Sequence, residues 1–223
     1  SLPSRGLGDV YKRQSYYRWL MMRKKQTGMI DSFKNIVPNL PKELDEKEFE
    51  IPLSFNSEKW SPEITGSEFF FDDFVEGEEI HHLDGQTIEE AEHQIATRLY
   101  QNNARVHFNN HIEKDGRFGK RIIYGGYIIS LARAISCNGL ANAFKILAIH
   151  SGRHAAPTFS GDTIYAWSKI LKKKKIDDNL GTLLVRTIAS KNDSKINFPD
   201  KDKLTENMVL DLEYSVLIPV KKK

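Results

Sequence analysis

Runs of apolar residues, several of them alternating with polar ones, predict a series of β-strands. The first, FFFDDFVEGEEI at residues 69–80, is predicted to be a strand that runs into a turn at Gly77. A run of antiparallel strands is expected later in the chain, at FKILAIHSG, DTIYAWSKIL, TLLVRTIAS and MVLDLEYSVLIPV. The Lys172–Lys175 run predicts a solvated hairpin tip. In the last strand the positions that alternate with polar residues are Leu210, Leu212, Tyr214, Val216 and Ile218.

A helical period separates the first strand from the later ones. Thr87 is followed three residues later by Glu90, which predicts a capping box at the start of a helix that continues to about Tyr100. The apolar positions of this helix recur at a spacing of three or four residues: Ile88, Ala91, Ile95 and Leu99. Residues 102–120 have no such period and are expected to form an irregular loop.

A second helical segment, IIYGGYIISLARAISCNGL, is apolar on nearly all of its circumference. Such a helix is expected to be wrapped by other elements and not laid on a surface. Asn138-Gly139 is a suitable C-terminal stop for it. The order of one strand, helices and then antiparallel strands predicts an α+β fold in which a curled antiparallel sheet wraps around a central helix.

The region before residue 67 has a different character. Residues 1–14, SLPSRGLGDVYKRQ, are similar to a translated sequencing-library adapter, so they are excluded from the fold prediction. Residues 15–66 contain SYYRWLMMRKK, which predicts a strand, and then a proline-rich charged stretch typical of a linker. We therefore expect the last strand of a truncated preceding domain plus a linker, followed by one domain over residues 67–223. A natural N-terminal extension is the alternative.

Composition excludes several classes of protein. Hydrophobic residues make up 39% and charged residues 28% of the chain, as in ordinary globular domains. The net charge of +3 suits an anionic ligand, but the basic residues are not gathered on one predicted face, so no nucleic-acid partner is expected. Cys137 is the single cysteine, which excludes an intrachain disulfide and fits a reducing compartment. No apolar run approaches the roughly 20 residues of a membrane span, so the cytoplasm is expected.

The motifs resemble those of the MaoC-type dehydratases, a family with the hotdog fold. The resemblance covers about residues 67–220 and depends on VHF after the first helix, RFGKRIIYGG entering the apolar helix, and PTFSGDTIYAW entering a strand. DGQTIEEAEHQIATRLYQNNARVHF, ISLARAISCNGLANAF and SGRHAAPTFSGDTIYAWS are similar to the second half of the mesaconyl-CoA hydratase (β-methylmalyl-CoA dehydratase) family. Members of that family have two hotdog domains in one chain, so the resemblance implies the C-terminal half of a double hotdog.

The resemblance implies reversible addition of water across a double bond conjugated to a CoA thioester. No separate cofactor is implied, because coenzyme A is part of the substrate. The reaction requires a base for the water and donors for the thioester oxygen, where enolate charge develops. Gly125 and Gly126 open the apolar helix, where their amides would stabilise that charge, although close packing against a strand would also select glycine. Tyr124, directly before them, is expected to help bind the substrate.

His107, in the segment NNARVHFNN, is the candidate base, because imidazole titrates near neutral pH. Related single-domain hydratases have the pattern Asp-x-Asn-Pro-aliphatic-His, in which Asp and His share the water. Here Asn102 stands in the Asp position, and Ala104 and Arg105 replace Asn and Pro. An amide can orient a water but cannot accept its proton at neutral pH. His107 therefore acts alone, a carboxylate comes from elsewhere, or this half is not catalytic; a purely structural histidine is the simplest alternative.

An arginine is expected near the pocket, because mesaconyl-CoA has a free carboxylate besides the thioester. Arg153 and Arg121 are candidates, since a planar guanidinium suits both a carboxylate and a CoA phosphate. Arg105 and Arg133 compete with them, and the sequence does not rank the four. His81-His82 and His150…His154 lack ligand spacing, so no metal site is expected. Glu89, Glu92 and His93 are expected to face solvent or to pair along the helix. For His111 and Asp115, in the same loop as His107, solvent exposure is expected, and support of the site residues is the alternative.

Three functions follow from the resemblance. The first is a hydro-lyase acting on an enoyl-CoA, with mesaconyl-CoA or β-methylmalyl-CoA as the acyl-CoA substrate. The second is an acyl-CoA thioesterase, which would need a carboxylate on the apolar helix, and residues 127–137 contain none. The third is a non-catalytic half-domain that only binds acyl-CoA. In each case the domain is expected to pair with a second hotdog domain, in the same chain or in a homodimer, because strand edges need a partner.

Overall fold

The computed structural model describes residues 45–222 apart from 53, 196, 202 and 204, so the predictions for residues 1–14 and for SYYRWLMMRKK lie outside the described residues. Five antiparallel strands form one sheet: β1 (Glu79–Thr87), β2 (Lys145–His154), β3 (Thr163–Lys175), β4 (Leu180–Lys191) and β5 (Met208–Pro219). The α-helices are α1 (Pro62–Thr65), α2 (Glu90–Leu99), α3 (Asn110–Glu113), α4 (Gly125–Ile135) and α5 (Cys137–Leu140). Short 3₁₀ helices are η1 (Glu46–Glu48), η2 (Ser57–Lys59), η3 (Phe71–Asp73) and η4 (Arg105–His107).

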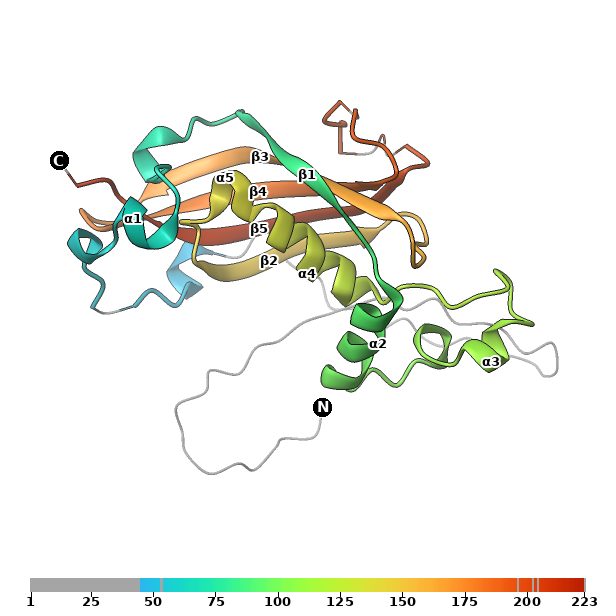
Figure 1. Ribbon diagram of the computed structural model, residues 1–223. Coiled ribbons are helices and arrows are strands. Elements are labelled where there is room, and N and C mark those ends of the chain that lie inside the picture. Colours follow the sequence, from blue (N-terminus) through green and yellow to red (C-terminus); the bar gives the residue numbers. More distant parts are fainter. Residues whose placement is uncertain (1–44, 53, 196, 202, 204, 223) are drawn as a thin grey trace, which may run out of the picture. The chain divides into compact units, whose positions relative to one another are not determined.

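The sheet has the strand order β1-β3-β4-β5-β2, with every neighbouring pair antiparallel. Figure 1 shows α4 lying along one face of this curved sheet, beneath β1 and across the other strands. β5 is an interior strand between β4 and β2, and each of its residues is buried. Its alternating apolar side chains from Leu210 to Ile218 belong to the main core, as the sequence predicts. The α+β prediction of a curled sheet with one long helix is confirmed.

Helix α4 packs on the sheet through one face. Ile128, Leu131 and Ala132 are buried in the main core, at the spacing that places side chains on one side of a helix. Ser130 and Ala134, on the other side, are exposed. The expectation that other elements wrap α4 therefore holds only in part: Tyr127, Ile129 and Ile135 are half-buried against the same core, and one side of the helix is open. The predicted stop is found just after α4, where Gly139 has a φ of 108° that an L side chain rarely adopts.

The predicted strand over residues 69–80 is wrong in its first half. Phe71–Asp73 forms η3, in which the Asp73 carboxylate accepts the Phe70 N–H at 2.9 Å. The helical turn buries Phe71, which lies so close to Gly181 of β4 that a Cβ on Gly181 would collide with the Phe71 ring. Gly77, with a φ of 87°, forms the predicted turn, and the strand itself starts only at Glu79.

The predicted capping box of Thr87 is also wrong. Thr87 is the last residue of β1, and its hydroxyl hydrogen bonds to the Thr163 hydroxyl of β3 at 2.8 Å. Helix α2 starts at Glu90, and its N-cap residue Glu89 makes no side-chain capping bond. Thr87 therefore pairs with β3 and does not cap α2.

Two further segments are more ordered than the sequence suggests. The Lys172–Lys175 run belongs to β3, and the turn comes after it, so the hairpin-tip prediction is wrong. The Lys173 ammonium donates to the carbonyl oxygens of Phe71 and Phe74, at 2.9 and 2.6 Å, which ties this end of β3 to the segment around η3. The predicted irregular loop over residues 102–120 contains η4 and α3.

Residues just before the predicted domain boundary pack on the sheet. Phe55 stacks on Phe144 with ring centroids 5.2 Å apart, and Trp60 lies 4.8 Å from the same ring. The Trp60 indole also donates to the side-chain oxygen of Asn142 at 2.9 Å. The boundary at residue 67 stays a prediction, and the end of the predicted linker is held by aromatic contacts.

A chain of buried hydrogen bonds crosses four strands of the sheet. It joins His82 of β1 to Ser168 of β3 (2.7 Å), Ser168 to Thr187 of β4 (2.7 Å), and Thr187 to Tyr214 of β5 (2.9 Å). The His82 Nδ1 lies 2.5 Å from the Asn138 carbonyl, which can only accept a hydrogen bond. The bonds must therefore run in one direction, with each hydroxyl donating toward the Nε2 of a neutral His82. Burial lowers the pKa of His82 to about 4, which agrees with that state.

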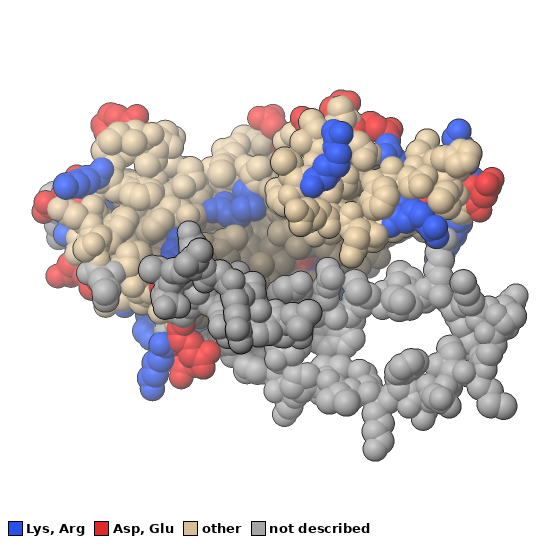
Figure 2. All heavy atoms as spheres, turned by 90° about the horizontal axis from the view of Figure 1, so that it is seen from below, with Lys and Arg blue, Asp and Glu red and all other residues tan. Residues whose placement is uncertain are grey.

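Charged groups of both signs are interspersed over the face drawn in Figure 2. This distribution agrees with the small net charge of +3. None of the helices within the described ranges has the length and apolar composition needed to cross a membrane.

Candidate active site

The N-terminus of α4 presents free backbone donors. Tyr124 is the N-cap residue, and its carbonyl accepts the N–H groups of Tyr127 and Ile128. The amides of Gly125 and Gly126 have no acceptor among the residues that the structure describes. Unpaired N–H groups and the positive end of the helix dipole together favour a negatively charged oxygen at this point.

Side chains lie close to both glycines. A Cβ built on Gly125 would lie 2.6 Å from Nε2 of His154, and one on Gly126 would lie 2.6 Å from the Tyr124 ring. Glycine is therefore required here by the approach of an imidazole from the end of β2 and of a phenol from the N-cap residue. His154 keeps an exposed edge, and partial burial of its ring lowers its pKa.

His107 lies beside this helix start. Its ring centroid is 5.6 Å from that of Tyr124, and its Nδ1 lies 3.0 Å from the Ile122 carbonyl. Because a carbonyl only accepts, Nδ1 must be the protonated nitrogen, and Nε2 is left with a lone pair. Burial lowers the pKa of His107, while the bond to Ile122 and the charge of Glu113 act in the opposite direction. The imidazole is therefore in the neutral form that can accept a proton at neutral pH.

His93 also lies at the start of α4. The prediction that it faces solvent or pairs along its own helix is wrong. His93 is 2% exposed, and its Nε2 accepts the backbone N–H of Tyr124 at 2.9 Å. Burial, together with the nearby His107, lowers its pKa to about 4. A neutral His93 thus fixes the residue from which α4 starts. Its neighbour Glu92 does pair, because its carboxylate accepts a hydrogen bond from the Tyr127 hydroxyl at 3.0 Å. Burial of Tyr127, together with this hydrogen bond, raises the pKa of Tyr127 to about 12.

Glu113 is a second residue that sequence reasoning missed. It lies in α3, is 6% exposed, and its charge acts on the titration of His107. Gly116 makes room for it, since a Cβ on that glycine would lie 2.7 Å from the Glu113 carboxylate. No motif identified Glu113, because burial of a charged residue depends on how α3 packs. The structure thus places a carboxylate near His107 within this domain.

Asn102 has a local structural partner. Its side-chain oxygen accepts the backbone N–H of Ala104 at 2.8 Å, which forms a turn just before η4. The side-chain oxygen is therefore used to shape the loop that presents His107. Whether the amide group also orients a water stays a prediction.

The two arginine candidates lie in different surroundings. Arg121 is held by Glu90 and Gln94 of α2 and by the Phe108 carbonyl, so its guanidinium joins α2 to the loop that contains His107. Arg153 lies opposite Asp211 in the β2–β5 register. Since side chains alternate along a strand, Arg153 points to the opposite face of the sheet from His154. A substrate-binding role for either arginine stays a prediction.

The other candidates are placed as follows. Arg133 is part-buried and donates to the Ser136 hydroxyl and the Ala143 carbonyl, which stabilises the end of α4. Arg105, His111 and Asp115 are exposed, as is Glu89. Within the described ranges, no group of three or more His, Cys, Asp or Glu side chains could hold a metal ion.

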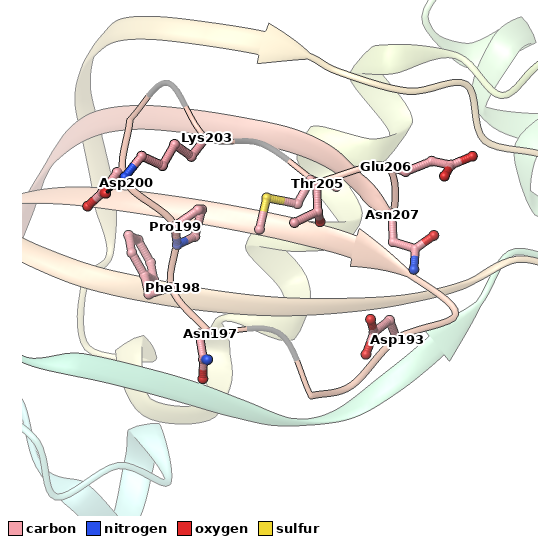
Figure 3. A pocket seen from close by; sticks show the side chains of 10 residues that line it. Asp193, Asn197, Phe198, Pro199, Asp200, Lys203, Thr205, Glu206 and Asn207 are labelled. Carbon is pink, nitrogen blue, oxygen red and sulfur yellow. Dashed lines mark hydrogen bonds and ion pairs between the residues drawn. The ribbon is translucent and has the colours of Figure 1, made fainter.

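A hollow of about 590 Å³ lies elsewhere, in the loop between β4 and β5. Figure 3 shows its polar lining, in which Asp200 and Lys203 lie close together. None of its lining residues belongs to the cluster at the α4 N-terminus. The chemistry of the molecule therefore concentrates at the start of α4, where imidazoles, a buried carboxylate and free amides meet.

Comparison with known proteins agrees with this arrangement. No family model matches the chain. The chain is 49% identical over 209 residues to the beta-methylmalyl-CoA dehydratase of Chloroflexus aurantiacus, and 40% identical over 208 residues to the mesaconyl-CoA hydratase of Cereibacter sphaeroides. Each alignment covers 92% of this chain but only 59% and 60% of the respective relative, so the chain spans about three fifths of their length.

Solved structures give the same fold. A MaoC-domain protein from Chloroflexus aurantiacus, 49% identical, superposes with a TM-score of 0.79 over 85% of this chain and 55% of its own. A double-hotdog protein from Mycobacterium tuberculosis, Rv0216, superposes with a TM-score of 0.52 over 77% of this chain and 48% of its own, at 22% identity.

The described domain therefore has the hotdog fold, as the sequence resemblance implied, and it is similar to a MaoC-domain protein over 85% of the chain. More particularly, the chain is a homologue of the proteins named beta-methylmalyl-CoA dehydratase and mesaconyl-CoA hydratase.

Proposed function

We propose that this chain is part of a hydro-lyase that adds water to the double bond of mesaconyl-CoA, or removes it from β-methylmalyl-CoA. The two relatives' names describe the two directions of that one reaction. The observation that supports the proposal is local: a neutral imidazole with a free Nε2 lies beside a helix start with unpaired amides. These are the base and the oxyanion donors that such a reaction requires.

In the hydration direction, His107 Nε2 takes a proton from water while the water oxygen bonds to the β-carbon. The electron pair of the carbon–carbon double bond moves toward the thioester, whose oxygen becomes negatively charged. The amides of Gly125 and Gly126 stabilise that enolate oxygen. The α-carbon then gains a proton, which balances the one taken from water, and His107 returns to its neutral form. Dehydration follows the same steps in reverse.

Glu113 supplies the carboxylate that the Asn102 substitution removes from the family pattern. It is buried near His107, and its charge stabilises the imidazolium that forms when His107 takes the proton. In this proposal Glu113 is a positioning residue that acts through His107, and Asn102 shapes the loop through its turn.

The acyl-CoA would bind where the domain pairs with a second hotdog domain, in a longer chain or in a homodimer. The relatives are longer than this chain, and Rv0216 has two hotdog folds in one protein. Ile95, Leu99 and Tyr100 of the α2 region are 49, 73 and 59% exposed, respectively, and form an apolar surface suited to such a partner.

The test is turnover of mesaconyl-CoA by the intact protein and by His107→Ala, followed as loss of the conjugated enoyl absorbance. We expect kcat/KM to fall by about 10²-fold or more in His107→Ala, because a positioned base contributes roughly 10²–10⁴-fold. His111→Ala is the matched control: His111 is exposed on α3 and should turn over normally.

Three results would contradict the proposal. Release of free thiol in place of enoyl loss would indicate a thioesterase, which is disfavoured by the absence of Asp and Glu from residues 127–137. An unchanged rate in His107→Ala would indicate that this domain is not the catalytic half. Absence of any turnover by the intact protein would remove mesaconyl-CoA as substrate.

A further inference from the structure

Basic and aromatic side chains form a compact group near the start of α4, which we call the basic–aromatic cluster: Arg117, Phe118, Lys120, Phe159 and Lys191. The Lys120 ammonium lies 4.2 Å from the centroid of the Phe159 ring, and the Lys191 ammonium lies 6.0 Å from the same centroid. The Phe118 ring meets Phe159 edge to face at 5.5 Å, and Arg117 lies 5.1 Å from the Phe118 centroid. Three segments of the chain therefore bring three cations around two aromatic rings.

The positive charge of this cluster is not neutralised within the described part of the chain. No described carboxylate forms an ion pair with Arg117, Lys120 or Lys191. Asp162, the nearest acid along the chain from Phe159, uses its oxygens to accept the Phe159 N–H and the Asn192 amide. The ammonium groups of Lys120 and Lys191, both close to one ring and neither in an ion pair, would favour an anion bound nearby.

Backbone contacts connect the cluster to the candidate active site. The Ile123 N–H donates to the Thr158 carbonyl at 2.8 Å, and the Lys191 ammonium donates to the Pro157 carbonyl at 2.7 Å. Lys120 is five positions before Gly125, and Phe159 is five positions after His154. Each separation is thus at most about 18 Å between Cα atoms. An extended segment of five residues is therefore long enough to connect the cluster to the proposed oxyanion site.

We propose that the basic–aromatic cluster binds the adenine nucleotide portion of coenzyme A, while the thioester lies at the α4 N-terminus. The identity of the ligand rests on the proposed function. The phosphates would pair with Lys120, Lys191 and Arg117, and the adenine would stack on an aromatic face. This combination of cations and rings matches a phosphorylated adenosine, and the pantetheine arm spans the gap to the thioester.

The test is titration calorimetry of the intact protein with coenzyme A and with pantetheine, neither of which reacts. In the double variant Lys120→Ala/Lys191→Ala, the Kd for coenzyme A should rise about tenfold or more, since each partly exposed charge pair contributes a few-fold. The Kd for pantetheine, which has no phosphate, should not change. The effect should shrink as salt is added. Lys175→Ala is the control for loss of a positive charge elsewhere, because Lys175 lies at the far end of β3.

The aromatic part is tested separately. Phe159→Leu should weaken coenzyme A binding, and Phe159→Tyr, which keeps the ring, should preserve it. Equal Kd values for coenzyme A in the double variant and in Lys175→Ala would overturn the inference. So would binding of free 3′,5′-ADP as tight as that of coenzyme A, because the site would then be one for free nucleotides. If the double variant loses coenzyme A binding but the intact protein does not turn over mesaconyl-CoA, the nucleotide site stands and the hydratase proposal fails. If the intact protein turns over mesaconyl-CoA and the double variant has an unchanged KM, the hydratase proposal stands and the nucleotide site fails.

Discussion

At the scale of single residues, the titration of His107 is set by opposing influences. Burial favours the neutral ring, and the negative charge of Glu113 favours the protonated one. Since the base must be neutral, kcat/KM should fall as the pH drops through the pKa of His107, which lies below the ordinary histidine value. In Glu113→Gln the pKa should fall further, so the acidic limb of the pH profile should move to lower pH.

The pH–rate profiles of wild type, Glu113→Gln and Asp115→Asn check this. Asp115 is exposed in the same loop, and removing its charge should leave the limb in place. A limb that stays fixed in Glu113→Gln, or that moves to higher pH, would show that Glu113 does not act on the base.

Gly125 offers a second test at the residue scale. Gly125→Ala should lower kcat/KM about tenfold or more while leaving stability nearly unchanged. Alanine is the better helix former, so the helix itself should not suffer. The added methyl group would instead meet Nε2 of His154 at 2.6 Å and push that ring over the free amides. Kinetics and a urea unfolding curve on the same variant separate the two effects. Ser130→Ala, on the exposed side of α4, is the control, and a large stability loss in Gly125→Ala would mean that the glycine serves packing alone.

At the scale of elements, the buried hydrogen-bond chain joins four strands into one unit. Ser168→Ala removes its middle member and leaves His82 Nε2 and the Thr187 hydroxyl each with one partner fewer. We expect the free energy of unfolding to fall by about 1–3 kcal/mol, the usual cost of unsatisfied buried polar groups. Urea denaturation measures it. Thr87→Val, which removes an exposed hydroxyl pair between β1 and β3, should cost far less, and an equal cost would show that the chain adds nothing to the sheet.

The elements also show how far the sequence alone can be taken. The later strands and α4 were predictable, because long apolar runs with clear periods leave few alternatives. Thr87 and the residues around Phe71 were mispredicted, since both carry local signals that pairing and packing override. At the site, the motif residues His107, Gly125 and Tyr124 do lie together. His93, His154 and Glu113 had no such signal, since their positions depend on contacts between segments distant in the sequence.

At the scale of the whole molecule, helix α2 is oriented against its own amphipathic pattern. Ile95 and Leu99 lie on the apolar stripe of the predicted helix, but the structure buries His93, Ala96 and Thr97 and leaves that stripe exposed. Burying a polar face while exposing large aliphatic side chains is unfavourable for an isolated domain, so this face is expected to be covered by a second hotdog domain.

For the 223-residue chain by itself that domain should be a second copy, and Leu99→Glu should shift the population from dimer to monomer. A charge in the centre of an apolar interface lacks a partner, which typically costs several kcal/mol of association energy. Sedimentation velocity over a range of concentrations measures the shift. Ile64→Glu is the matched control, because Ile64 is 79% exposed on α1, outside the α2 surface and not on a strand, and its substitution should leave the dimer intact. If both variants sediment like the wild type, α2 does not form the pairing surface, and the exposed Leu99 must be explained by some other contact.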